Sequence, residues 1–300
     1  MKDKVCLIVS FWLGERRKML PEYTQDKLHF LKQQIYFLEV YKHNLTKIVF
    51  NFNIIPEQYQ HIPEIFNLTP KQIQGAEVEI NLRENYGISY GAFSDIFSKY
   101  KTKYDYYVFN EDDYVFSQDN WDIYLVNKHN SYLDCGYLCI LSREPSKWFN
   151  YKKHAGCSIG IASTPNLLKL FKFCRERLPY PDKTLDDFKG DKDKTYRHFE
   201  EAQFDFTFNF LKLGLNLYDV RDDYKIIVDA PNIANKDVCI YFKDQHEDIL
   251  VKPLKIINKK FSWFASSDTE FSPNYTLLSL EEALHCYNNK LGYDEYKSYE

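Results

Sequence analysis

Apolar strands and amphipathic helices alternate along the first 130 residues, and this alternation limits the possible folds more than any other feature. Residues 5–9, Val-Cys-Leu-Ile-Val, form a continuous apolar run typical of a parallel strand that is covered on both faces. Residues 26–41 follow with leucine and isoleucine at helical spacing. Strands and helices that alternate in this way form βαβ units. The sequence therefore predicts an α/β fold with a central, mostly parallel sheet flanked by helices.

The same alternation continues beyond the first helix. We expect further strands at residues 47–52, 76–80, 106–109, 136–141 and 158–162. We expect further helices at residues 56–66, 90–100, 121–128, 165–177, 199–213 and 281–290. Because the pattern is less regular after residue 225, we expect a domain at residues 1–225 and a C-terminal extension, residues 226–300, that packs on it.

The composition argues against several classes of protein. Charged residues make up 27% of the chain and the net charge is −4, so there is no basic footprint and we expect no nucleic-acid partner. No apolar run is long enough to cross a bilayer, so we expect no transmembrane segment and a soluble, cytoplasmic protein. The seven cysteines include no zinc-type C-x-x-C pair, and we expect them to be thiols in a reducing compartment.

An acidic triplet, Glu111-Asp112-Asp113, comes directly after the strand expected at residues 106–109. In parallel sheets, ligands bind at the carboxyl ends of the strands, which is where this triplet would lie. Three adjacent carboxylates repel one another, and a hard cation such as Mg²⁺ or Mn²⁺ would neutralise them together with phosphate oxygens. The alternative is a solvated turn after a strand.

A glycine-containing segment precedes this strand and opens the helix expected at residues 90–100. It holds Arg83, Asn85, Gly87 and Gly91. The glycines allow a close approach of the backbone to a ligand, and a helix N-terminus attracts anions. The segment is neither a P-loop nor a G-x-G-x-x-G fingerprint. The alternative is that the glycines serve only the packing of the loop and the helix.

Two further segments are candidates for catalysis and for substrate binding. Glu200 and Glu201 lie at the start of the helix expected at residues 199–213, where one of them would act as a general base. The helix dipole alone also favours acidic residues in a first turn. Residues 154–160 form a turn of small residues that either leaves room for a substrate or is simply tight.

Taken in order, these motifs resemble the glycosyltransferases of GT-A fold, especially the family-2-like group. The resemblance covers residues 3–220 and implies a Rossmann-like GT-A domain. Ser10 and Phe11, at the end of the first strand, are similar to the nucleotide-binding start of that group. The segment with Arg83, Asn85, Gly87 and Gly91 is similar to its second nucleotide-contacting region.

The acidic triplet is similar to the D-x-D motif of this group in its E-D-D form. The resemblance implies that Asp113 binds Mn²⁺ or Mg²⁺, while Glu111 and Asp112 contact ribose, metal-bound water or the sugar. Glu201 resembles the catalytic base of the inverting members, and Glu200 and Asp205 remain alternatives for that role.

The resemblance also bears on the C-terminal region and on the source of the protein. His246 or His285 would supply a third metal ligand, or both are ordinary surface or core histidines. Residues 86–116 are similar to glycosyltransferases of large DNA viruses, which would place the protein in the host cytoplasm.

The expected function is a metal-dependent transfer of a sugar from a nucleoside-diphosphate sugar to a hydroxyl of a glycan acceptor. The resemblance favours an inverting reaction, with a retaining one as the alternative. Two other functions remain open. The protein would be a sugar nucleotidyltransferase on a related sheet, although the loop after the first strand holds a single glycine, Gly14. It would otherwise be a non-catalytic glycan-binding protein.

Overall fold

The computed structural model describes most of the N-terminal two thirds of the chain and a few residues beyond. The described residues are 2–14, 26–112, 114–116, 119–139, 142–143, 154–180, 202–203, 205–220, 225–226 and 251–253.

The described elements follow one another in a largely alternating order. The strands are β1 (Val5–Trp12), β2 (Lys47–Ile54), β3 (Gln72–Ile73), β4 (Ala76–Glu84), β5 (Tyr106–Glu111), β6 (Tyr114–Phe116), β7 (Cys135–Cys139), β8 (Ser142–Arg143), β9 (His154–Ala155), β10 (Gly160–Ser163), β11 (Asn216–Asp219), β12 (Lys225–Ile226) and β13 (Val251–Pro253). The helices are α2 (His29–Val40), α3 (Ile62–Leu68), α4 (Ile88–Tyr100), α5 (Trp121–Asn130) and α6 (Thr164–Phe173), with 3₁₀ turns η1 (Pro56–His61) and η2 (Lys101–Lys103). Residues 205–212 are also helical.

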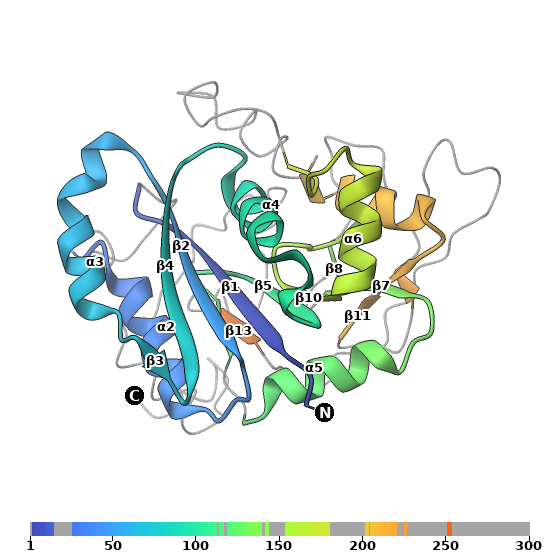
Figure 1. Ribbon diagram of the computed structural model, residues 1–300, viewed down its shortest axis with the longest axis horizontal. Coiled ribbons are helices and arrows are strands. Elements are labelled where there is room, and N and C mark those ends of the chain that lie inside the picture. The colour runs from blue at the N-terminus through green and yellow to red at the C-terminus, as the bar shows by residue number, and fades with distance from the viewer. Residues whose placement is uncertain are drawn as a thin grey trace, which may run out of the picture.

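A nine-stranded sheet in the order β12-β11-β7-β10-β5-β1-β2-β4-β3 forms the centre of the described structure (Figure 1). Strands β4, β2, β1 and β5 are parallel neighbours. Strand β10 is antiparallel to both β5 and β7, and β11 runs parallel to β7. Strands β3 and β12 are antiparallel to their neighbours. Six of the nine strands therefore run in one direction.

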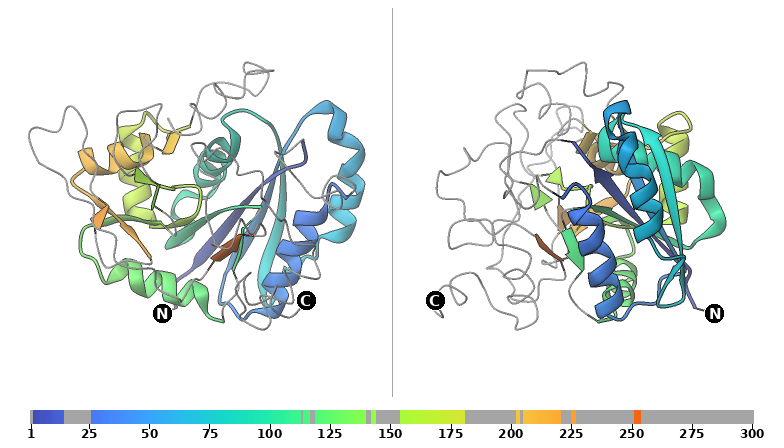
Figure 2. Two further views of the ribbon diagram at one scale, coloured as in Figure 1. Left: turned by 180° about the vertical axis from the view of Figure 1, so that it is seen from behind. Right: turned by 90° about the vertical axis from the view of Figure 1, so that its left-hand side faces the viewer.

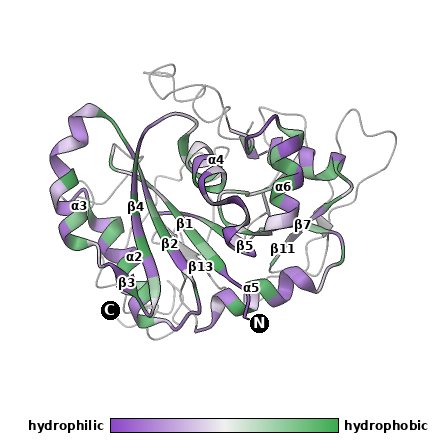
Figure 3. Cartoon of the chain, viewed as in Figure 1, coloured by the Kyte–Doolittle hydropathy of each residue, from purple (hydrophilic) through white to green (hydrophobic). Residues whose placement is uncertain are grey.

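Helices cover both faces of this sheet, as the edge-on view in Figure 2 shows. On one face, side chains of α2, α3 and α5 pack with Leu7 and Val9 of β1 in one apolar cluster. On the other face, side chains of α4, α6 and residues 205–212 pack with Cys6 and Ile8 in a second cluster. Residues 5–9 of β1 thus alternate between the two cores, which is why this part of the strand is apolar throughout (Figure 3).

The α/β, Rossmann-like fold class that the sequence predicts is confirmed, with a mostly parallel sheet between two layers of helices. The strands differ from expectation chiefly at their carboxyl ends. Strand β1 continues to Trp12 rather than ending at Val9, and β4 continues to Glu84 rather than ending at Ile80. Several short strands were not expected, namely β3, β6, β8, β9, β11, β12 and β13. The helix expected at residues 56–66 is a 3₁₀ turn followed by α3.

The C-terminal region contributes one described strand. Residues 251–253 of β13 pair antiparallel with β6, so the chain after residue 226 returns to the strand that follows the acidic triplet. The division at residue 225 stays a prediction, and the helix expected at residues 281–290 lies outside the described residues. Among the helices that the structure describes, none is long and apolar enough to cross a membrane.

Helix α5 carries a buried histidine, and this residue makes the stability depend on pH. His129 is 4% exposed and packs edge-on against the ring of Tyr106, with ring centroids 5.6 Å apart. Burial lowers the pKa of His129 from 6.5 to about 4. Between these values the unfolded chain binds the proton and the folded chain does not, so the stabilising contribution is complete above pH 6.5 and lost as the pH falls toward 4.

We therefore expect the variant His129→Leu to lose less stability than the wild type on acidification. Between pH 7 and pH 4 the free energy of unfolding should fall by about 2 to 3 kcal/mol more in the wild type, because only its histidine must stay neutral. Urea unfolding at a series of pH values measures this. Curves that stay parallel from pH 7 to pH 4 would contradict the assignment.

Candidate functional site

The order of the strands creates a topological switch point between β1 and β5. From β1 the chain moves through α2 to β2 and then to β4 on one side, and through α4 it returns to β5 on the other side of β1. Helices α2 and α4 lie on opposite faces of the sheet. In open α/β sheets, ligands bind outside the carboxyl ends of the strands at such a point. Here those ends carry Ser10 of β1 and Glu111 of β5, which are register partners.

A row of polar residues crosses four strands at this edge. Ser10 is paired in register with Glu111 on one side and with Asn51 on the other, and Asn51 is paired with Asn81 of β4. The amide of Asn81 donates to Asn51 Oδ1 at 2.6 Å. Ser10 and Asn51 are 5% and 0% exposed. Buried polar side chains in the centre of a sheet cost stability unless they are hydrogen-bonded, so such a row is unusual without a ligand to serve.

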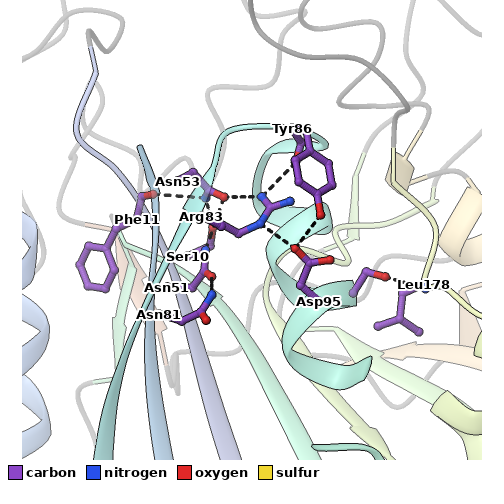
Figure 4. Close-up of polar contacts among 10 residues, drawn as sticks. Ser10, Phe11, Asn51, Asn53, Asn81, Arg83, Tyr86, Asp95 and Leu178 are labelled. Atoms are coloured by element: carbon purple, nitrogen blue, oxygen red, sulfur yellow. Dashed lines mark hydrogen bonds and ion pairs between the residues drawn. The ribbon is translucent and has the colours of Figure 1, made fainter. Parts of the chain in front are cut away.

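The next row of the sheet holds a buried arginine, shown in Figure 4. Arg83 of β4 is the register partner of Asn53 of β2, and its Nη1 donates to Asn53 Oδ1 at 2.6 Å and to the Tyr86 carbonyl at 2.9 Å. Its Nε donates to Asp95 Oδ2 of α4 at 2.8 Å. Asn53 in turn donates to Ser10 Oγ at 2.8 Å. Arg83 thus joins β2, β4 and α4 and connects them to the end of β1.

One nitrogen of the Arg83 guanidinium makes no hydrogen bond to the described residues. Arg83 Nη2 is buried and has no hydrogen-bond partner among the described residues. The same is true of Asn85 Oδ1, which belongs to a side chain only 8% exposed. An unsatisfied buried donor and an unsatisfied buried acceptor therefore lie at the end of β4 and in the loop that follows it. Each costs free energy that a polar ligand or a water molecule would recover.

The two glycines of this segment are explained by close packing. Gly87 caps α4 in the left-handed conformation, with φ 63°, and a Cβ there would lie 2.6 Å from the ring of Tyr180. A Cβ on Gly91 would lie 2.3 Å from the Tyr86 carbonyl oxygen and 3.0 Å from Arg83 Nη2. The space beside Gly91 is thus filled by the protein itself, in agreement with the packing alternative for that residue.

Phe11 is separated from the other predicted nucleotide contacts. It is 1% exposed and stacks on Phe52 with ring centroids 4.6 Å apart, inside the core on the α2 face of the sheet. Ser10 enters the polar row beside Asn53, while the next residue of the strand points to the opposite face. The backbone carbonyl of Phe11 still takes part, because it accepts from Asn53 Nδ2 at 3.2 Å.

The first two residues of the acidic triplet are tied to the ends of neighbouring elements. Glu111 Oε1 accepts from Ser89 Oγ in the first turn of α4 at 2.8 Å. Asp112 is 3% exposed, and its Oδ2 accepts from the Trp12 amide at 3.0 Å. The Asp112 amide donates to the Ser10 carbonyl at 3.1 Å. The acidic turn is therefore closed against the end of β1, and α4 begins beside it.

A complete metal site is not formed by the described residues alone. Within them no three histidine, cysteine, aspartate or glutamate side chains are grouped closely enough to hold an ion. The expected ligand Asp113 lies outside the described residues, as do the expected bases Glu200 and Glu201 and the histidines 246 and 285. Asp205, the alternative base, is an exposed residue of the helical segment 205–212. The roles of all these residues stay predictions.

Several residues of this site were not expected from the sequence. They are Gln34, Asn51, Asn53, Asn81, Ser89 and Asp95. The alternation of Asn51 and Asn53 at the end of an apolar strand is the one signal that pointed to them, because period two places both amides on the same face.

Comparisons with known proteins give distant structural likenesses only. No protein-family model and no curated protein sequence matches the chain. Among solved structures, one from Bacillus anthracis, described as a glucose-1-phosphate thymidylyltransferase in complex with sucrose, is 15% identical with a TM-score of 0.39. The match covers 72% of this chain and 85% of that one. TarS of S. aureus is 12% identical with a TM-score of 0.35, covering 67% of this chain and 34% of TarS. Neither likeness is close enough to assign a family.

The hydrogen bonds of Arg83 to Asn53, Asp95 and the Tyr86 carbonyl lead to a stability prediction. The variant Arg83→Met should lower the free energy of unfolding by about 1 to 3 kcal/mol, because it removes the donors to Asn53, Asp95 and the Tyr86 carbonyl. Chemical denaturation measures the change. Arg175→Met is the control, because the Arg175 side chain is exposed and its replacement should cost less than about 0.5 kcal/mol. Equal losses in the two variants would contradict the bracing role.

Proposed function

We propose that this protein is a glycosyltransferase that moves a sugar from a nucleoside-diphosphate sugar to a hydroxyl group of a glycan acceptor. The observation that carries the proposal is the position of the acidic turn. Glu111 ends β5 beside Ser10 of β1, at the switch point of a mostly parallel sheet, and the first turn of α4 contacts it through Ser89. Donor binding at the carboxyl ends of β1, β4 and β5 follows from this arrangement.

The kind of phosphate ligand follows from the charges at this edge. Dinucleotide-binding folds hold pyrophosphate on the backbone amides of a glycine-rich loop after the first strand. Here β1 ends in Ser10, Phe11 and Trp12, and carboxylates face the same edge from β5. A diphosphate would be repelled by these carboxylates unless a divalent cation lay between them. A nucleoside diphosphate bound together with Mn²⁺ or Mg²⁺ is the ligand that fits.

The residues of this edge would share the work as follows. The Ser10 hydroxyl and the Asn81 side chain, with Arg83 Nη2 and Asn85 Oδ1, would offer donors and acceptors to the nucleoside. The cation, held at Asp113, would neutralise the negative charge of the diphosphate leaving group. Glu201 would take the proton from the acceptor hydroxyl on the opposite side of the sugar, as an inverting displacement requires.

A thermal-shift experiment tests the donor site. With Mn²⁺, one of UDP, GDP, dTDP or CDP should stabilise the wild type by about 2 to 3 kcal/mol at a hundredfold excess over its Kd, because the ligand binds only the folded chain. EDTA should abolish the shift. Asp113→Asn should weaken it strongly while its melting temperature without ligand stays near that of the wild type.

Other outcomes of this screen count against the proposal. If none of the four nucleotides shifts the melting temperature, the donor site is wrong. Release of diphosphate from a nucleoside triphosphate and a sugar 1-phosphate would show a nucleotidyltransferase instead. Nucleotide binding without any transfer or donor hydrolysis would favour a non-catalytic glycan-binding protein.

The proposed base has its own test. Glu201→Gln should bind the nucleoside diphosphate as the wild type does but transfer or hydrolyse the donor at least a hundredfold more slowly, since general base catalysis contributes about 10² to 10⁴ in rate. Titration calorimetry and a coupled assay for nucleoside diphosphate release measure the two properties. Normal turnover would exclude Glu201, and Glu200→Gln and Asp205→Asn are the matched variants for the remaining carboxylates.

A further inference from the structure

We propose that Gln34 of helix α2 is a positioning residue that holds the acidic turn in the conformation the donor site needs. The inference rests on the proposed function for its reference to a donor. It concerns a side chain that lies in the core layer beneath the turn, away from the polar row on the α4 face. Among the described residues its side chain donates to main-chain oxygens, so a nucleotide need not touch it.

The contacts of Gln34 bracket the expected metal ligand. Its side-chain amide nitrogen donates to the Asp112 carbonyl at 2.8 Å and also to the Tyr114 carbonyl. These two carbonyls belong to the residues on either side of Asp113. The Asp112 carbonyl belongs to the peptide unit before Asp113 and the Tyr114 carbonyl to the second peptide unit after it, so one amide group ties the described main chain on both sides of that position. Gln34 is 1% exposed, so water does not compete for these bonds.

A second amide supports the same turn from within. Asn110 Nδ2 donates to the Tyr114 carbonyl at 2.9 Å, so this oxygen accepts from two side chains. Asn110 is 0% exposed, and its Oδ1 has no hydrogen-bond partner in the part of the chain that the structure describes. With the Asp112 contacts to Ser10 and Trp12, the turn is held from β1, from α2 and from its own strand.

The chemistry of the site explains why an amide stands at this place in the core. Gln34 lies among apolar residues of α2, where a leucine or methionine would pack without the cost of burying an amide. Buried carbonyls need hydrogen-bond donors, however, and Gln34 donates to both of these oxygens. Without the glutamine both oxygens would lose this donor, so fewer hydrogen bonds would hold the turn and its carboxylates in place.

The neighbouring glutamine offers a matched control. Gln33 is 2% exposed on the same helix, and its Oε1 has no hydrogen-bond partner among the described residues. The variants Gln34→Met and Gln33→Met therefore make the same change at adjacent, equally buried positions. Only the first removes donors to the acidic turn.

The experiment measures two properties of each variant. The first is the Kd for the nucleoside diphosphate that stabilises the wild type most, titrated with Mn²⁺. The second is the rate of hydrogen exchange at the Asp112 amide without ligand or metal. Gln34→Met should bind at least tenfold more weakly and exchange at least tenfold faster, whereas Gln33→Met should stay within twofold of the wild type in both.

The alternative outcomes separate the inference from the proposed function. If the wild type binds no nucleoside diphosphate, the proposed function fails and the inference falls with it. If the wild type binds but Gln34→Met binds and exchanges normally, the inference alone is overturned. Equal defects in both variants would show a general packing loss and would also overturn it. Should Gln34→Met fail to fold, Gln34→Asn replaces it, because it keeps the amide but is one methylene too short, and the same two thresholds apply.

Discussion

The pairing of β1 between β2 and β5 is the constraint on which the rest of the structure depends. Both edges of β1 are hydrogen-bonded and both faces are buried, so the strand has no freedom to shift its register. Its last residues then decide what meets at the carboxyl edge. Ser10 and Trp12 bind the turn that contains Asp112, and Ser10 also accepts from Asn53. A register shift of one residue would place the Ser10 side chain in the apolar core on the α2 face and the Phe11 side chain in the polar row.

The polar row and the side chain that supports the acidic turn lie on opposite faces of the sheet. Asn51, Asn53 and Arg83 lie on the α4 face, where hydrogen bonds between side chains satisfy most of their polar atoms. Gln34 approaches from the α2 face and holds the turn by its main chain. Gln34 therefore holds the turn through main-chain oxygens and does not use the oxygens of its carboxylates. Among the described residues, Arg83 Nη2 and Asn85 Oδ1 stay unsatisfied, and they lie at the carboxyl end of β4 and just after it.

The sequence predicted the longer apolar strands and missed short strands such as β6, as well as the ends of β1 and β4 that include polar residues. Residues 5–9 and 76–80 were identified correctly, yet β1 and β4 continue for several residues that include Ser10 and Arg83. Polar residues after an apolar run usually indicate a loop, and only the register with β2 keeps these in the sheet. The antiparallel place of β10 between β5 and β7 was also unpredictable, because periodicity gives the existence of a strand but not its neighbours.

The same limit explains which site residues were found. Glu111 and the glycine-containing segment are visible in the sequence because acidic triplets and glycines are rare in buried elements. Gln34 is not visible in this way, since an amide within a helix resembles an ordinary surface position, and Asn53 is visible only through its alternation with Asn51. Their importance arises only from register and from the direction of a side chain, which are tertiary properties. For a site at a sheet edge, the charged groups can therefore be predicted from the sequence, whereas the neutral amides that orient them are identified only from the structure.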